Sequence, residues 1–219
     1  MILTSLEKHP KVFAHEQLFG AKSLETRHIF VRGLTNAQVG ERCFDRKTLQ
    51  ISDDTAIVFP CAPGMREEDK ATSFWGWVDS RSDIQLLHLR RRNVLKAYVS
   101  QQVALLTGAW GNRYPAVEAE PRITVNREAA EVYLKWDLKD SLACQARYAN
   151  RPHMAVFYED LMANPKRLLN LIQQFIGVEP IDIWPRTKKQ ATRSLRDAIT
   201  NYDQLVSDWK GTEYEQYLE

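Results

Sequence analysis

The chain alternates short apolar runs with longer stretches in which apolar residues recur at helical spacing. Three short apolar runs bounded by polar or turn residues predict buried strands, at residues 55–60, 84–89 and 154–158. Four helices are predicted, at residues 94–106, 127–148, 165–176 and 195–208, and the third has the clearest apolar face at helical spacing. Short strands that alternate with helices are typical of an α/β protein with a parallel sheet.

Capping residues mark where these helices begin. Asn93, Asn126 and Asn164 each stand directly before a helical pattern. An asparagine side chain at that position accepts a hydrogen bond from a backbone N–H group in the first turn. Ser194 and Asp197 resemble a capping box at the start of the last helix. The helix starts are therefore better defined than the remaining boundaries.

The first third of the chain is less regular. Residues 2–8 predict the tail of a helix that Pro10 stops. Residues 13–50 mix apolar and polar positions and contain several glycine turn signals, so they predict no clear element. Residues 73–80 predict a short helix or turn.

Composition narrows the function classes only moderately. The chain has 219 residues, 44% hydrophobic and 26% charged, and a net charge of +2, so no nucleic-acid partner is expected. Cys43, Cys61 and Cys144 are scattered, which favours free thiols over a zinc site or a disulfide framework. No apolar run has the length of a membrane span and no signal peptide is visible, so we expect a cytoplasmic protein that needs no metal.

Three consecutive arginines stand between the second predicted strand and the helix that follows it. Ligands of open parallel sheets bind at the carboxyl ends of strands, where Arg90, Arg91 and Arg92 fall. Ser100 follows the cap Asn93 by about two helical turns and so faces the same side. Arg92 and Ser100 are therefore candidates to hold one oxyanion together. The alternative is a solvated basic face, or arginines that pair with acidic neighbours.

Several segments resemble the sulfotransferase family. "RNVLKAYVS", Arg92 to Ser100, resembles the motif with which sulfotransferases bind the 3′-phosphate of 3′-phosphoadenosine-5′-phosphosulfate (PAPS). The wider stretch "LHLRRRNVLKAYVSQQVALLTGAW" is similar to the bacterial trehalose-sulfotransferase-like branch. "VFYEDLMANPKRLLNLIQQFIGV" resembles the late strand–helix unit of the family, and "KKQATRSLRDAITNYDQL" its C-terminal segment. The resemblance covers most of the chain and is weakest at residues 20–80.

The resemblance implies a fold. It is the three-layer P-loop-NTPase-like sulfotransferase fold of the α/β class, with a central parallel sheet, as a single domain over residues 1–219. The family's first strand and its phosphosulfate loop, similar to G-x-x-[GS]-[ST]-[ST], have no counterpart in the sequence. We therefore expect an N-terminally truncated chain in which that strand and loop are missing.

The resemblance also implies an activity. Sulfotransferases move a sulfuryl group from PAPS to a hydroxyl or amine, here of a carbohydrate, lipid or small-molecule acceptor, and release adenosine 3′,5′-bisphosphate. Arg92 and Ser100 would hold the 3′-phosphate, and Lys189 and Arg193 would close over the nucleotide. Glu16 matches the family's acidic residue that takes the acceptor proton, and the adjacent His15 is the second candidate base.

Other interpretations stay open. A non-catalytic sulfotransferase-like protein that binds a nucleotide or a partner fits the missing loop, and self-association through an exposed sheet is possible. An NTP-dependent kinase is disfavoured because G-x-x-x-x-G-K-[ST] is absent. Phe74, Trp75 and Trp77 line either an acceptor pocket or the core. Glu159 and Asp160 are expected to orient loops or to pair with a basic residue.

Overall fold

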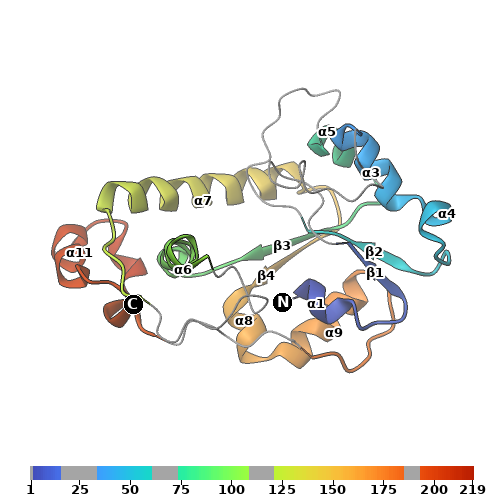
Figure 1. Ribbon diagram of the computed structural model, residues 1–219. Helices are drawn as coiled ribbons and strands as arrows, with labels where there is room; N and C mark the ends of the chain where they lie inside the picture. Colours follow the sequence, from blue (N-terminus) through green and yellow to red (C-terminus); the bar gives the residue numbers. More distant parts are fainter. Residues whose placement is uncertain (1, 16–33, 61–73, 109–120, 185–192) are drawn as a thin grey trace. The chain divides into compact units, whose positions relative to one another are not determined.

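A computed structural model describes residues 2–15, 34–60, 74–108, 121–184 and 193–219 (Figure 1). The chain divides into two compact units. The first unit contains Met1–His88, Asn150–Val156 and Asp160–Arg186, and the second contains Leu89–Ala149, Phe157–Glu159 and Thr187–Glu219. The single domain implied by the family resemblance stays a prediction.

Two short parallel strands lie in the first unit. Strand β1 (Val12–Ala14) pairs in parallel with strand β2 (Ala56–Val58), with Phe13 opposite Ile57. The strand predicted at residues 55–60 is therefore confirmed within narrower bounds, although its residues are half-buried rather than fully buried. Strand β1 has no clear pattern in the sequence and was not predicted.

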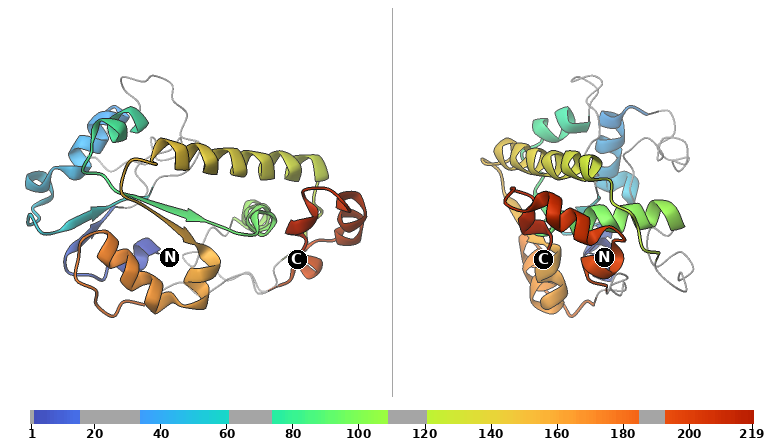
Figure 2. Two further views of the ribbon diagram at one scale, coloured as in Figure 1. Left: turned by 180° about the vertical axis from the view of Figure 1, so that it is seen from behind. Right: turned by 90° about the vertical axis from the view of Figure 1, so that its left-hand side faces the viewer.

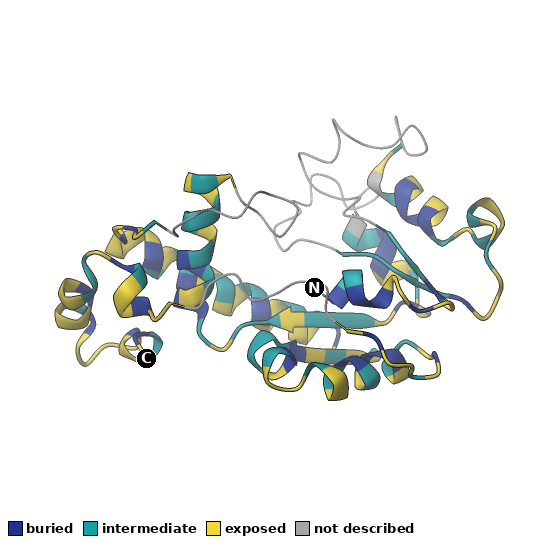
Figure 3. Cartoon of the chain, turned by 60° about the horizontal axis from the view of Figure 1, so that its bottom comes forward, coloured by how far each residue is buried: buried dark blue, intermediate teal, exposed yellow. Residues whose placement is uncertain are grey.

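Most helices of the first unit have buried residues, whereas α4 has none, as the burial colours of Figure 3 show. They are α1 (Ile2–Leu6), α3 (Asn36–Phe44), α4 (Arg46–Leu49), α5 (Phe74–Ser80), α8 (Tyr158–Ala163) and α9 (Pro165–Phe175). Helix α9 begins as predicted: the Asn164 side chain accepts the N–H of Arg167 at 3.1 Å, and Pro165 holds the first helical position. Its Leu169 and Ile172 join Leu6 and Val12 in the core of the unit.

A second pair of strands carries the chain from the first unit into the second. Strands β3 (Leu86–Arg90) and β4 (His153–Phe157) form a two-stranded parallel sheet, and the N–H of Leu86 donates to the carbonyl of Pro152 at 3.1 Å. The predicted strands at residues 84–89 and 154–158 are thus confirmed to within two residues, although most of their residues are half-buried or exposed rather than buried. Within the described ranges the strands form two sheets of two, and the three-layer P-loop-like architecture stays a prediction.

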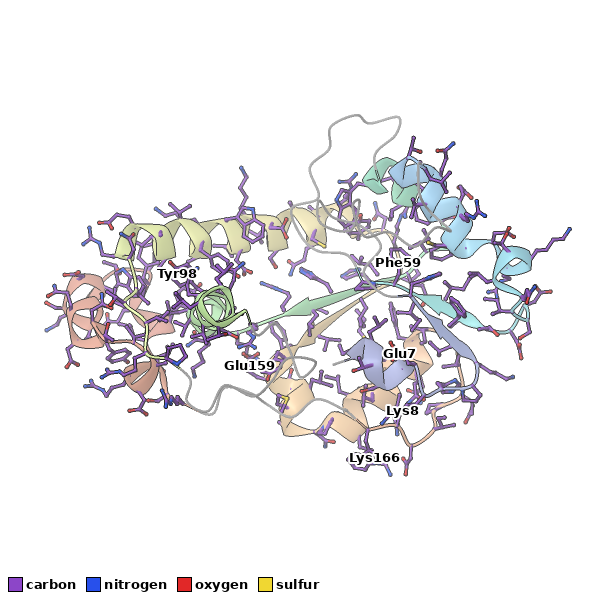
Figure 4. The ribbon with its side chains drawn as sticks, viewed as in Figure 1. Glu7, Lys8, Phe59, Tyr98, Glu159 and Lys166 are labelled. Atoms are coloured by element: carbon purple, nitrogen blue, oxygen red, sulfur yellow. The ribbon has the colours of Figure 1, made fainter. Side chains whose placement is uncertain are left out.

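Helix α6 (Val94–Thr107) packs against helix α7 (Arg127–Arg147) in the second unit, and both are confirmed predictions (Figure 2). Tyr98 of α6, labelled in Figure 4, meets Tyr133 of α7 with ring centroids 5.3 Å apart. The unit has its own core, in which Leu95, Leu134 and Trp209 are among the most buried side chains.

The predicted last helix is wrong as a single element. It is two helices, α10 (Leu195–Ala198) and α11 (Tyr202–Trp209), followed by the 3₁₀ turn η2 (Glu215–Tyr217). The break occurs because Ile199 pairs with Ile123, and the N–H of Thr200 donates to the carbonyl of Ile123 at 2.8 Å. The Asn201 side chain bonds both backbone groups of Val125. Ser194 is confirmed as the cap of α10, because its hydroxyl oxygen accepts the N–H of Asp197 at 3.2 Å, while the Asp197 carboxylate accepts the Ser194 hydroxyl instead of completing a capping box.

No helix in the described ranges combines the length and the apolar character needed to cross a bilayer.

Candidate functional site

The arginine junction (Arg90–Asn93) connects strand β3 to helix α6. The strand ends at Arg90, and the helix begins immediately after Asn93. The Asn93 side-chain oxygen accepts the N–H of Lys96 at 2.9 Å, which satisfies one of the free N–H groups of the first turn. The predicted placement of the arginines at the carboxyl end of a parallel strand is therefore confirmed.

Aromatic rings at the end of β4 support the three guanidinium groups. The Arg91 guanidinium carbon lies 4.1 Å from the ring centroid of Tyr158, and that of Arg92 lies 4.4 Å from the centroid of Phe157. The Arg90 guanidinium lies 5.6 Å from the same Phe157 ring. A guanidinium over an aromatic ring is attracted to it electrostatically, and its planar fork of N–H donors is of the kind that suits an anion.

A carboxylate from the same segment fixes the backbone of the junction. Glu159 lies where β4 turns into α8 (Figure 4), and its Oε2 accepts the backbone N–H of Arg92 at 3.1 Å. The expectation that Glu159 orients a loop is confirmed. Asp160, its neighbour in the sequence, is exposed.

The side-chain amide of Asn93 connects the C-terminal segment to the arginine junction. The Asn93 amide donates to the carbonyls of Tyr217 and Glu219 at 2.9 Å and 3.0 Å. The Tyr202 hydroxyl donates to the carbonyl of the buried Leu218. One side chain thus both starts α6 and holds the segment after η2.

Helix α7 contributes a half-buried carboxyl group near the arginines. Burial raises the pKa of Asp137, while the charge of Arg90 opposes that rise. Burial also raises the pKa of the Tyr133 phenol, with Asp137 adding to the rise and Arg91 opposing it. Arg90 therefore fits the alternative in which an arginine neighbours an acidic group. Arg92 differs because it is the exposed member of the three.

The predicted nucleotide-binding residues are only partly described. Arg92, Ser100 and Arg193 all lie in the second unit, Ser100 half-buried on α6 and Arg193 exposed before α10. Ser100 stands about 10 Å along the helix axis from Asn93. Their convergence on one anion stays a prediction. Lys189, with the adjacent Lys188, lies outside the described residues.

The predicted base residues lie in the first unit. Glu16 is outside the described residues. His15 follows β1, and its Nε2 lies 3.0 Å from the carbonyl oxygen of Cys43. A carbonyl only accepts, so this nitrogen carries the proton, and Nδ1 holds the lone pair of the neutral ring. Burial lowers the pKa of His15, which favours that neutral form.

Trp77 fits the core interpretation rather than the acceptor pocket. Its ring is buried and packs on Gly40 and Phe44, and its Nε1–H donates to Glu41. Trp75 is half-buried, and the side chain of Phe74 is outside the description.

Sequence reasoning missed the roles of Phe157 and Tyr158 in the junction. The sequence predicts both only as the end of a strand, and their contact with the arginines depends on the pairing of β3 with β4. The available signal was that the two predicted strands would place both carboxyl ends at one edge of a parallel sheet.

Comparison with known proteins finds a distant similarity to a sulfotransferase. The matched protein is Nodulation protein H from Rhizobium tropici, with 26% identity over 135 residues, 60% of this chain and 53% of that protein. The chain therefore spans about half the length of this relative. No family model and no solved structure matches the chain.

Proposed function

We propose that the chain is a sulfotransferase domain that transfers a sulfuryl group from PAPS to a hydroxyl or amine of a carbohydrate, lipid or small-molecule acceptor. The observation that carries the proposal is the arginine junction: an exposed Arg92, stacked on Phe157 at the carboxyl end of a parallel strand, directly before a capped helix. The distant similarity to a sulfotransferase supports the same class of reaction.

The residues of the junction fit the 3′-phosphate of the nucleotide. The Arg92 guanidinium has the planar fork that matches two phosphate oxygens, and its stacking limits the orientations it can adopt. Ser100 supplies a hydroxyl donor two turns along α6, and Arg193 and Lys189 supply further positive charge. A site of this kind would prefer adenosine 3′,5′-bisphosphate over 5′-AMP, because only the former carries the 3′-phosphate.

The proposed chemistry is an in-line displacement at sulfur. Glu16 takes the proton of the acceptor hydroxyl, the oxygen forms a bond to sulfur, and the bond from sulfur to the phosphate oxygen breaks. Adenosine 3′,5′-bisphosphate leaves with the electron pair of that bond. His15 is the second candidate for the base, because its neutral ring offers the Nδ1 lone pair. Positioning and cationic donors would supply most of the rate enhancement.

Isothermal titration calorimetry tests the nucleotide site. We expect the wild-type chain to prefer adenosine 3′,5′-bisphosphate over 5′-AMP, and Arg92→Ala with Ser100→Ala to weaken bisphosphate binding by about 10-fold or more, because charge-assisted hydrogen bonds are lost. Arg127→Ala with Ser207→Ala, two exposed positions of the same unit, is the matched control. A folded wild-type chain without the preference would overturn the proposal.

An assay of sulfuryl transfer then distinguishes an enzyme from a non-catalytic nucleotide-binding protein. Bisphosphate binding with transfer of the sulfuryl group from PAPS to an acceptor would support the enzyme. Binding without transfer to any hydroxyl or amine acceptor would favour the non-catalytic nucleotide-binding protein.

A further inference from the structure

One short segment contacts both the backbone and the side chain of Arg92. The segment is Phe157–Glu159, at the end of β4. Phe157 lies under the Arg92 guanidinium at 4.4 Å, and Glu159 accepts the Arg92 N–H at 3.1 Å. Tyr158, between them, lies 4.1 Å from the Arg91 guanidinium. The aromatic contact supports the guanidinium group, and the carboxylate holds the backbone that carries it.

The hydrogen bond that the Arg92 N–H donates to Glu159 holds a residue that lies between two elements. Arg92 follows the last residue of β3 and precedes the cap of α6, so neither the strand nor the helix ladder holds its N–H. Without that bond, the Arg92 backbone gains rotational freedom, and an anion would have to order it on binding. Ordering costs reduce affinity, and a site held in advance avoids them.

The charge of Glu159 acts in the opposite direction. A carboxylate beside the junction repels an incoming phosphate, so its benefit to anion binding comes from its position and not from its charge. A neutral side chain with an oxygen in the same place would keep the benefit and remove the repulsion. Glutamine has this shape, because its amide oxygen accepts the same N–H.

We infer that Glu159 is a positioning residue, which holds Arg92 ready for the 3′-phosphate of the nucleotide. The inference rests on the proposed function, since it concerns the same anion site. It predicts that the hydrogen bond matters more than the charge, and that the effect appears in the selectivity for the 3′-phosphate. A merely structural role for Glu159 would change stability and leave that selectivity as it is.

Calorimetry with adenosine 3′,5′-bisphosphate and 5′-AMP tests the inference on four variants of the full chain. Glu159→Ala should weaken bisphosphate binding by about 5-fold or more with little change for 5′-AMP, as expected for one lost hydrogen bond to a charged group. Glu159→Gln should bind the bisphosphate at least as well as the wild type. Glu159→Asp keeps the charge but draws the oxygen back by one methylene, so it should weaken binding like Glu159→Ala. Asp160→Ala, which removes the neighbouring exposed carboxylate, should bind as the wild type.

The outcomes separate this inference from the proposed function. A wild-type preference that survives in both Glu159→Ala and Glu159→Asp would overturn the positioning role alone. Weak binding by Glu159→Gln would also overturn it, because the charge would then be the operative feature. A folded wild-type chain without the preference would overturn the proposed function and this inference with it. Should Glu159→Ala fail to fold, the comparison of Glu159→Gln with Glu159→Asp decides the question.

Discussion

The Asn93 side chain has two roles that substitutions can separate: it caps helix α6 and it binds the C-terminal segment. Its oxygen caps α6 through the N–H of Lys96, and its amide donates to the carbonyls of Tyr217 and Glu219. Asn93→Ala removes all three hydrogen bonds. The lost cap costs about 1 kcal/mol, and each lost bond to a carbonyl costs about 0.5 kcal/mol, the low end of the usual range, because these groups are partly exposed. We therefore expect a loss of about 2 kcal/mol in the free energy of unfolding.

Asn93→Ser is the matched control. A serine oxygen caps a helix about as well as an asparagine oxygen, but its side chain is too short to reach the two carbonyls as well. The expected loss is only the two tail bonds, about 1 kcal/mol. Urea unfolding followed by circular dichroism at 222 nm measures both variants. Hydrogen exchange of the Tyr217 and Leu218 amides adds a local readout, which should become faster in both variants.

The stabilities of the two variants test the cap and the tie to the C-terminal segment separately. Equal losses for Asn93→Ala and Asn93→Ser would show that the cap contributes nothing. A serine variant as stable as the wild type, with unchanged exchange at Tyr217, would refute the tie between the C-terminal segment and the arginine junction.

Two further predictions concern the first unit. A Cβ added by Gly40→Ala would lie 2.5 Å from Cδ2 of the buried Trp77 ring, so the variant should lose about 1 to 2 kcal/mol of stability by overpacking, even after the helix propensity of alanine is counted. In a Trp77→Leu background the same change should be neutral or stabilising, and urea unfolding of the four proteins in this cycle checks the sign. His15 has a folded-state pKa below its ordinary 6.5, so protons bind the unfolded chain first and stability should fall as the pH drops from 6.5 through the lowered pKa. His15→Gln, which can keep a donor to Cys43, should remove this part of the pH dependence, and equal slopes in the two proteins would contradict the assignment.

The elements that sequence reasoning predicted well are those whose signals are local. Helices α6, α7 and α9 each begin at an asparagine whose side chain accepts an N–H of the first turn, at Asn93, Asn126 and Asn164. A cap lies within one stretch of chain, as does the apolar stripe of α9, so no knowledge of distant residues is needed to find them. The arginine junction was predictable for the same reason, because it is one continuous segment.

The elements that were missed depend on distant partners. Helix α3 has a complete capping box, with Thr35 and Gln38 bonded reciprocally, yet Gly40 in its interior argues against a helix. The structure explains that glycine, because the Trp77 ring packs where a side chain would lie. The break between α10 and α11 has the same origin, since Ile199 leaves the helix to pair with Ile123.

The three arginines are alike in the sequence and differ in their surroundings, which decides which of them suits an anion. Arg90 is half-buried, and its charge lowers the pKa of the Asp137 carboxyl group against the larger effect of burial. Arg91 is also half-buried over the Tyr158 ring, and its charge opposes the rise that burial causes in the pKa of the Tyr133 phenol. Arg92 combines an exposed side chain, an aromatic support and a backbone held by a carboxylate. Exposure admits the ligand and the two contacts reduce the ordering cost, so the preference for Arg92 follows from the surroundings of the junction as well as from the motif.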